Sequence, residues 1–498
     1  MIGPVKSRRT GAVLIVVLVL VLLMGVAAYG YLLSMQTENI AARASGDYLI
    51  TQQAAFSGLD LLSAILELPR YQRRELGGVA NNPTLFAGAI LDDRFDVADE
   101  DLPRFLVTAP NSLRHGQMPM RFGAMDESAK LHLVKLVQWD QQQADSARNA
   151  LLRLPGMTPD VADAILDWVD SDSQPRFEGA ESDAYAGLAT PVRPRNGKPF
   201  DLEELLLVRG VDQLRLFGAT TNTASADQPD FTLTDESFHP WSQYLTVYSA
   251  HRNESRDGSP RIFINDPQLD SLHQQLVERM PLAWANFIVL FRQHGPGGSS
   301  DQTMAPDQVT LDFTLPATLR IESPLDLIDA TVSVSHNGEM VSVASPFSSE
   351  PLMMQTQLPE LLDHVTVSPD TKFGGRVNIN LAPREVLLGV PDIDDSLAER
   401  ILAARSMAGE DNPDRDHPVW LLTHGLVDIA TMRQLLPNVN SGGDVFRAEF
   451  WGWTDEQAPT YRCEAVVDAT ERTARQIYFR ELDTTQWRAG TVPTNRDE

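Results

Sequence analysis

The chain has 498 residues, with 41 basic and 68 acidic side chains, and its formal net charge is −27. This surplus of acids disfavours nucleic acid as a partner, because binding phosphates needs clusters of Lys and Arg, and it suits divalent cations. The single cysteine, Cys463, excludes an intrachain disulfide, and the length leaves room for two or three domains.

A long apolar run follows the first basic residues. No charged side chain interrupts residues 10–37, and about 20 helical residues cover the hydrocarbon core of a bilayer. Lys6, Arg8 and Arg9 precede the run without any acid, so we expect a short cytoplasmic N-terminus and export of the bulk of the chain.

The border of this run resembles the leader of type IV prepilins. A short basic segment ends in Gly11, directly before Ala12. The resemblance implies that prepilin peptidase cuts between Gly11 and Ala12 on the cytoplasmic side and leaves the apolar helix in place. A secretory signal peptide would have a shorter apolar region, with its cleavage site after it. An uncut membrane anchor remains the alternative.

The fifth residue after this border is Val16. Most pilins and pseudopilins have Glu there, and its carboxylate neutralises the N-terminal amine of the neighbouring subunit in the filament. A buried acid is tolerated only when paired, and a subunit with nothing above it needs no such acid. Among pseudopilins, the lack of this Glu is typical of the K-type minor pseudopilins of type II secretion systems (GspK), which resemble a cap on the filament tip. An ordinary membrane anchor would lack it as well.

Helical spacing of apolar residues continues beyond the membrane to Leu66, and Pro69 marks the expected end. An unbroken helix from Ala12 would be about 80 Å long at roughly 1.5 Å per residue. Gly46 and Gly58 are candidate kinks. A long stem that projects into a soluble head is the plan of pilins.

The middle of the chain contains a repeated pattern. Before the repeat, the pattern of residues 118–134 predicts two short strands around a turn. Residues 151–169 and 386–404 then share the order helix, Pro-containing turn, acidic N-cap region, helix. Each has a downstream partner of similar pattern, at 202–211 and 419–426, which predicts two helix-hairpin-helix-like units.

Strand-like alternation occurs between these units and after them. In residues 222–371 it predicts a β-rich insertion of unknown role, with one helix at 268–280. Near the C-terminus it predicts three antiparallel strands at 445–451, 460–468 and 475–481. We therefore expect an α+β pseudopilin fold, with a long N-terminal transmembrane and stem helix packed on an antiparallel sheet and an inserted helical domain.

Acidic side chains gather at the end of the first repeat. Asp163, Asp167 and Asp170 share one helix face by their i, i+4, i+7 spacing, so they repel one another unless a cation neutralises them. Calcium takes about six to eight oxygen ligands, which a helix end running into a Gly-containing loop can supply, although the EF-hand spacing is missing. A solvated acidic loop with helix caps is the alternative.

Residues 167–185 also carry the strongest resemblance to GspK proteins, and the match continues at 196–197 and 202–210. In that family the acidic stretch lies where calcium binds. The resemblance therefore implies calcium as a cofactor, with ligands from Asp167, Asp170, Asp172, Glu181 and Asp183. Ser182 and Ala184 depart from a commoner Asp and Tyr, which leaves the ligand set open.

Patterns typical of catalysis are missing from the sequence. It contains no His-Glu-x-x-His, no Gly-x-Ser-x-Gly and no phosphate-binding loop, and Cys463 lies inside a predicted strand, where we expect it in the core. We therefore expect no enzyme. An alternative function is a membrane-anchored helix-hairpin-helix protein of DNA uptake or competence, or a type IV pilus minor pilin. Acids flank the hairpin turns, however, where a grip on DNA needs basic residues.

The resemblance covers roughly residues 1–70, 118–217 and 372–482. It implies a minor pseudopilin at the tip of the periplasmic pseudopilus, which helps to initiate pseudopilus assembly and supports protein export across the outer membrane. The implied partners are the I- and J-type minor pseudopilins, the major pseudopilin filament and prepilin peptidase. The implied location is the inner membrane, crossed once, with the N-terminus cytoplasmic and the bulk periplasmic.

These expectations divide the chain into nine segments: a prepilin leader (1–11), the transmembrane part (12–34) and periplasmic part (35–70) of the stem, the first part of the head (71–134), a first helical part with the acidic loop (135–221), the β-rich insertion (222–371), a second helical part (372–440), the C-terminal strands (441–485) and a tail (486–498).

Overall fold

The computed structural model describes residues 10–90, 102–109, 121–187, 190–218, 239–298, 302–336, 338–408, 415–454 and 460–482. Most of the expected leader and all of the expected tail lie outside these ranges.

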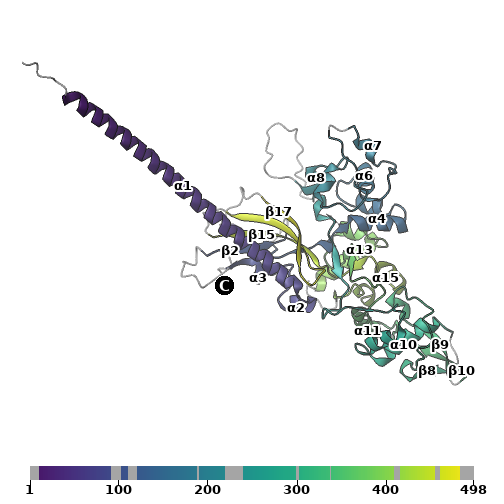
Figure 1. Ribbon diagram of the computed structural model, residues 1–498. Helices are drawn as coiled ribbons and strands as arrows, with labels where there is room; N and C mark the ends of the chain where they lie inside the picture. Colours follow the sequence, from purple (N-terminus) through teal and green to yellow (C-terminus); the bar gives the residue numbers. More distant parts are fainter. Residues whose placement is uncertain are drawn as a thin grey trace, which may run out of the picture.

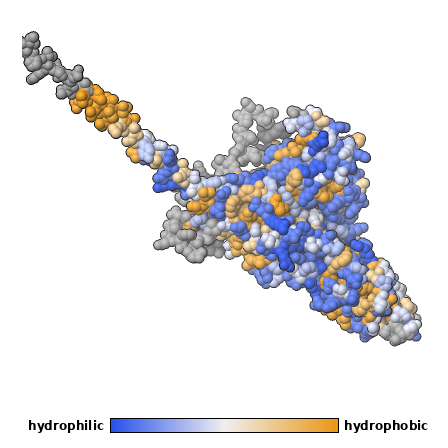
Figure 2. All heavy atoms as spheres, viewed as in Figure 1, coloured by the Kyte–Doolittle hydropathy of each residue, from blue (hydrophilic) through white to orange (hydrophobic). Residues whose placement is uncertain are grey.

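A single helix, α1 (Thr10–Glu67), forms the stem (Figure 1). Its most apolar window has a mean hydropathy of 2.9 and is not buried at all, so its length and composition suit a membrane span. This part is orange in Figure 2 and stands clear of the head. The second half packs on the head through side chains such as Ala55, Leu62 and Leu66. The prediction that the stem helix ends before Pro69 is confirmed.

The helix runs unbroken through Gly46 and Gly58. At Gly58 the reason for glycine is a close approach, because a Cβ there would lie 2.9 Å from the Phe105 ring. Gly452 lies on a strand of the sheet that faces this helix. A side chain is excluded there as well, since its Cβ would lie 1.9 Å from the carbonyl oxygen of Thr51. Glycines on both sides let the helix and the sheet approach closely.

The stem packs on an antiparallel sheet with the order β1-β2-β15-β16-β17, and β3 also pairs with β15. The strands are β1 (Ala87–Ile90), β2 (Arg104–Thr108), β3 (Met125–Asp126), β15 (Val445–Trp453), β16 (Tyr461–Asp468) and β17 (Arg475–Glu481). Phe450 of β15 lies opposite both Val107 and Cys463, and the three side chains are buried in the core shared with α1. The α+β fold and the C-terminal strands are confirmed.

A helical domain lies beside this sheet, and both predicted repeats contribute to its one hydrophobic core. The first part holds α4 (Leu133–Gln142), α5 (Ser146–Leu152), α6 (Pro159–Val169), α7 (Ser182–Tyr185), η3 (Glu203–Leu207) and α8 (Gln213–Phe217). The second part holds α12 (Arg384–Gly389), α13 (Asp395–Ala408), α14 (Trp420–Thr423) and α15 (Ile429–Leu435). Each repeat therefore forms two helices around a turn, and its assignment as a helix-hairpin-helix unit stays a prediction.

Short elements join the parts of the head. They are α2 (Arg70–Glu75), α3 (Pro83–Phe86), η2 (Glu127–Ala129), β4 (Leu131–His132), η4 (Trp241–Gln243), β5 (Leu245–Thr246), β6 (Ala250–Arg252), β12 (Lys372–Gly374), β13 (Val377–Asn378) and β14 (Val439–Asn440). The strands pair as β4 with β5, β6 with β12, and β13 with β14. The two strands predicted within 118–134 are only two residues each, and α4 already begins at Leu133.

The prediction that residues 222–371 are β-rich with one helix is correct only in part: short strands and the helix predicted at 268–280 are present, but two further helices were missed. The described part of this block contains three helices, α9 (Leu269–Val277), α10 (Leu282–His294) and α11 (Pro351–His364). Its other elements are β7 (Ile262–Phe263), β8 (Thr303–Met304), η5 (Pro306–Gln308), η6 (Pro324–Leu327), β9 (Thr331–His336), β10 (Glu339–Ala344) and β11 (Val365–Thr366). Residues 284–293 of α10 are all buried, so this helix has no polar face to give a helical period.

The block has a hydrophobic core of its own between α10 and the β9–β10 hairpin. Its edges nevertheless join the helical domain, because Leu245, Met354 and Leu358 belong to that domain's core. Figure 1 shows α10, α11 and the hairpin at the end of the molecule far from the free end of the stem.

Candidate metal centre

The acidic loop begins where α6 ends. Pro159 starts the helix, and Asp170 is its C-cap in an extended conformation, so the chain leaves the helix axis there. Asp163 and Asp167 are both buried on α6. The helix thus presents carboxylates to the loop at 171–181, as their spacing predicts.

The two carboxylates inside the helix hold this loop in place. Asp163 accepts a hydrogen bond from Arg148 Nε at 2.8 Å and one from the backbone N–H of Glu178 at 3.2 Å. Asp167 accepts from the backbone N–H of Arg176 at 3.2 Å, and the Arg176 guanidinium lies 3.7 Å away. Because these acids have protein partners, their repulsion is already offset without a cation.

Three other carboxylates converge across the loop. One oxygen each of Asp170, Asp172 and Glu181 lies within 4.8 Å of the other two. Asp170 and Glu181 are only 7% and 6% exposed, whereas Asp172 is exposed. Asp170 Oδ1 and both Glu181 oxygens are buried without a hydrogen-bond partner among the described residues. Such atoms are costly to bury unless a ligand satisfies them.

The electrostatics of the cluster fit this geometry. Burial raises the pKa of Asp170 to about 7, and the negative charges of Asp172, Asp167 and Glu181 add to the effect. Burial, together with Asp167, also raises the pKa of Glu181. Arg176 Nη2 lies 3.3 Å from Asp170 Oδ2 and offsets part of the charge. The cluster is therefore an oxygen-rich site with unbalanced negative charge, which suits a hard cation such as calcium.

The five predicted ligands divide into three groups. Asp170, Asp172 and Glu181 form the cluster, and Asp167 lies next to it, bound to Arg176. Asp183 is exposed on α7 and is not part of the cluster. Which of them hold a metal stays a prediction.

Several residues that position the loop were missed by sequence reasoning. Asn196 donates from Nδ2 to the carbonyl oxygen of Asp172, and Arg209 Nη2 donates to that of Gly179 at 3.0 Å. Arg148 and Arg176, which bind the helix carboxylates, were also missed. These contacts join residues 9 to 30 positions apart, so no local spacing could reveal them.

The proposed processing site and tip position lie at the other end of the molecule. Gly11 and Ala12 are in the first turn of α1, and Val16 is exposed on the same helix. Cleavage and the role of Val16 stay predictions.

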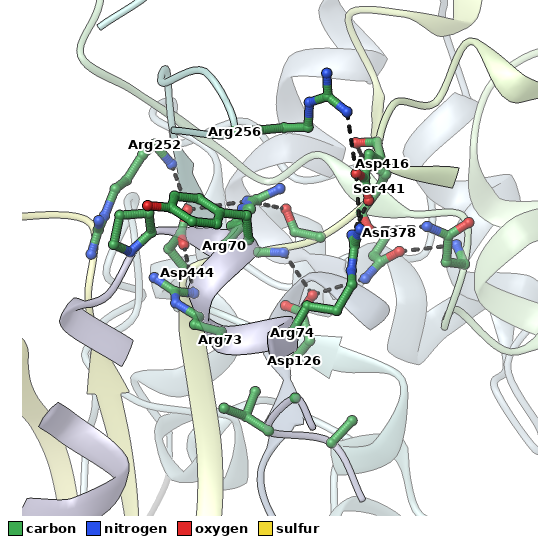
Figure 3. A pocket seen from close by; sticks show the side chains of 18 of the residues that line it. Arg70, Arg73, Arg74, Asp126, Arg252, Arg256, Asn378, Asp416, Ser441 and Asp444 are labelled. Atoms are coloured by element: carbon green, nitrogen blue, oxygen red, sulfur yellow. Dashed lines mark hydrogen bonds and ion pairs between the residues drawn. The ribbon is translucent and has the colours of Figure 1, made fainter. Parts of the chain in front are cut away.

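A second polar cluster ties the stem to the head. Figure 3 shows arginines from α2 and from β6 around Asp444, and Arg74 near Asp416. Asp444 Oδ2 lies 3.2 Å from Arg70 Nη2, and Asp444 Oδ1 lies 3.1 Å from Arg73 Nη1. Burial acts to raise the pKa of Asp444, but the neighbouring guanidinium groups of Arg70 and Arg73 hold it well below its usual range. A cavity of about 260 Å³ opens beside this cluster.

Residues 129–216, which include the acidic loop, match the family model for type II secretion system (T2SS), protein K. Type II secretion system protein K of Pectobacterium carotovorum subsp. carotovorum is 40% identical over 52 residues, or 10% of this chain and 16% of that protein. Protein K of Dickeya chrysanthemi is 27% identical over 132 residues, or 26% of this chain and 32% of that protein. The chain thus aligns with less than a third of either relative.

Among solved structures, the chain aligns with one from the GspK-GspI-GspJ complex of the enterotoxigenic Escherichia coli type 2 secretion system. The TM-score is 0.37 at 11% identity, over 89% of this chain and 100% of that chain. The family match and the two relatives show that part of this chain, which includes the acidic loop, is similar to type II secretion system protein K.

Proposed function

We propose that the protein is a minor pseudopilin of a type II secretion system. It acts at the tip of the periplasmic pseudopilus, helps to initiate its assembly and supports protein export across the outer membrane. The protein K match over residues 129–216 carries this proposal. The role is structural rather than catalytic. The DNA-uptake alternative is not favoured, because the matching family belongs to secretion and acids flank the hairpin turns.

The stem supplies the contacts with the filament. Large apolar side chains of residues 13–33 are exposed around α1, so they face lipid in the membrane and can pack on neighbouring stems in a pseudopilus. Val16 brings no carboxylate for the N-terminal amine of a subunit above it. The protein therefore sits at the tip with the I- and J-type minor pseudopilins, above the major pseudopilin filament.

The basic residues before α1 support a cytoplasmic N-terminus and a periplasmic head, with one pass through the inner membrane. Prepilin peptidase then cuts between Gly11 and Ala12. A secretion assay tests this. Deleting the gene in its own host should stop release of the exported proteins into the medium, and the parent gene should restore it.

The Gly11→Val variant should keep its leader and fail to restore secretion, because the peptidase requires a small residue before the cut. Immunoblotting reports the leader by a shift in mass. Normal secretion without the gene would contradict the function, and a normally trimmed Gly11→Val variant would contradict the cleavage site alone.

The acidic cluster holds a divalent cation, calcium, between Asp170, Asp172 and Glu181. The support is that three buried carboxylate oxygens lack a partner among the described residues while the helix carboxylates are already bound. The cation would supply the missing positive charge and fix residues 170–181 against α6. Its effect is on stability, since binding only to the folded state raises the free energy of unfolding.

Thermal unfolding of the full chain in detergent tests the site. Calcium at about 100 times its Kd should stabilise by about 2.7 kcal/mol and raise Tm by a few degrees. Glu181→Gln should lose this shift, whereas the control Asp183→Asn, which removes one charge from α7 outside the cluster, should keep it. No shift in the parent, or equal shifts in the two variants, would rule out the cluster as the site.

A further inference from the structure

A second cavity lies where the insertion, the helical domain and α2 meet. Its volume is about 410 Å³, within the range of small-molecule sites. Part of its wall is apolar, from Leu362, Val365, Val367, Phe373 and Leu436. The rest is polar and rich in arginine, in a chain whose net charge is −27.

Two of these arginines have no acid partner among the residues that the structure describes. Arg376, next to β13, stacks on Phe373, with its guanidinium carbon 3.9 Å from the centre of the ring. Arg261, next to β7, donates from Nε to the carbonyl oxygen of Asp363 at 3.3 Å. Neither guanidinium lies within 4.0 Å of a carboxylate in the part of the chain that the structure describes.

The other charged groups at the cavity are already paired. Arg70 lies 3.2 Å from Asp444, and Arg433 lies 2.9 Å from Asp326. Glu254 lies 3.5 Å from Arg252. Asp416 pairs with Arg74, and Glu322 lies 3.8 Å from Arg320. Asp363, near Arg261, is engaged by Arg256 at 3.4 Å and by His417 at 3.5 Å.

The two unpaired cations therefore repel each other in a partly buried space. Burial lowers the pKa of Arg376 to about 10, and the positive charge of Arg261 adds to the effect. Burial also lowers the pKa of Arg261 to about 10, although the negative charge of Asp363 acts in the opposite direction. An anion between them would relieve both the repulsion and the desolvation.

We propose that this cavity binds an organic carboxylate with an apolar substituent, held by the guanidinium groups of Arg261 and Arg376. Guanidinium groups present paired donors that match the two oxygens of a carboxylate. The apolar wall suits a hydrocarbon body, which an inorganic phosphate lacks. Two sources share this chemistry, a small organic acid and the C-terminal carboxylate of a peptide.

Isothermal titration calorimetry on the full chain in nonionic detergent tests the site. Hexanoate should bind, and hexanamide, which has the same shape without the charge, should bind at least tenfold more weakly. Inorganic phosphate should also bind more weakly than hexanoate. Equal binding of hexanoate and hexanamide, or of hexanoate and phosphate, would overturn the proposal.

Variants locate the site. Arg376→Gln should weaken hexanoate binding by roughly tenfold or more, the loss expected for a charge-assisted hydrogen bond. The control is Arg384→Gln, which removes the same charge from an exposed ion pair outside the cavity and should bind like the parent. Any hexanoate that partitions into detergent micelles affects the titrations of both variants equally, so it does not alter their comparison. Equal affinities in the two variants would place the carboxylate elsewhere and overturn the proposal.

Two peptides distinguish the sources. Acetyl-Ala-Leu carries a free C-terminal carboxylate, and acetyl-Ala-Leu-amide does not. Binding of the free acid more tightly than hexanoate, with loss in the amide, assigns a chain end as the ligand. Binding of hexanoate alone assigns a small organic acid. Failure of both carboxylates to bind contradicts the proposal.

Discussion

Gly179 lets the acidic loop fold tightly against α6. A Cβ at this position would lie 1.9 Å from Asp167 Oδ2 and 3.0 Å from the backbone nitrogen of Arg176. The same carboxylate accepts the Arg176 N–H that turns the loop back onto α6. A side chain at 179 must therefore push apart the contact that holds the loop.

We expect Gly179→Ala to reduce the free energy of unfolding by about 1–3 kcal/mol, the usual cost of overpacking a tight contact. Urea denaturation of the full chain measures it. Gly187→Ala is the control, because nothing lies within 4 Å of a Cβ there. The geometry of the loop is contradicted if both variants unfold at the same urea concentration.

At the scale of single residues, the sequence predicted the cluster only in part. Helical spacing correctly placed Asp163 and Asp167 on one face of α6. It could not show that Arg148 and Arg176 already bind them, because those contacts depend on how α5 and the loop fold back. For the same reason it could not separate the clustered Glu181 from the exposed Asp183 two residues later.

Among the elements, α2 joins the end of the stem to the sheet and to the insertion. Arg70 and Arg73 on this short helix bind Asp444, which directly precedes β15, and the backbone N–H of Arg252 in β6 donates to the same carboxylate at 2.8 Å. Arg73 also donates to the carbonyl oxygen of Leu66 near the end of α1. One carboxylate thus fixes the end of the stem to the sheet and to the insertion.

Asp444→Asn should therefore destabilise the protein by about 3–5 kcal/mol, because it leaves the buried guanidinium of Arg73 without its counter-charge. The control Glu471→Gln breaks an exposed pair with Lys372 and should cost about 0–1 kcal/mol. Chemical denaturation monitored by tryptophan fluorescence compares the two. Similar small losses in both variants would show that the junction carries little stability.

The low pKa of Asp444 also predicts how the stability of the protein depends on pH. Its pKa is lower in the folded protein than in the unfolded chain, so its contribution to stability is present above the unfolded pKa and is lost as pH falls through the acidic range below it. In Asp444→Asn this acid-dependent loss should be smaller than in the parent. An unchanged slope of stability against pH below about 4 would contradict the pairing.

Whole elements differ in how well the sequence predicted them. The stem and the strands β15, β16 and β17 follow simple apolar periods and were predicted within a few residues. Helix α10 was missed because it is buried on all sides, and α11 because Pro359 lies inside it. Strands β1 and β2 were not predicted, because β2 pairs with β15, which is distant in the sequence, and β1 pairs in turn with β2.

The molecule as a whole is a long stem with a head much wider than the stem at one end (Figure 1). The 58 residues of α1 reach roughly 87 Å at about 1.5 Å per residue, and the apolar side chains of 13–33 are exposed in the isolated chain. A head of this width beside a single stem fits the end of a filament more easily than its shaft. The exposed stem, in turn, requires either lipid or other stems around it.

The central proposal is that this protein assembles with minor pseudopilins, and co-purification from membranes tests this proposal most directly. The full chain, tagged at its C-terminus and extracted in mild detergent, should bring down the I- and J-type minor pseudopilins of its own secretion system in stable amounts. A variant in which only the exposed residues 13–33 are replaced by an unrelated transmembrane sequence of equal length should bring down less, because the apolar stem contacts are lost while the part of α1 packed in the head is kept. Purification of the full chain without either partner, from cells that express both, would contradict the account.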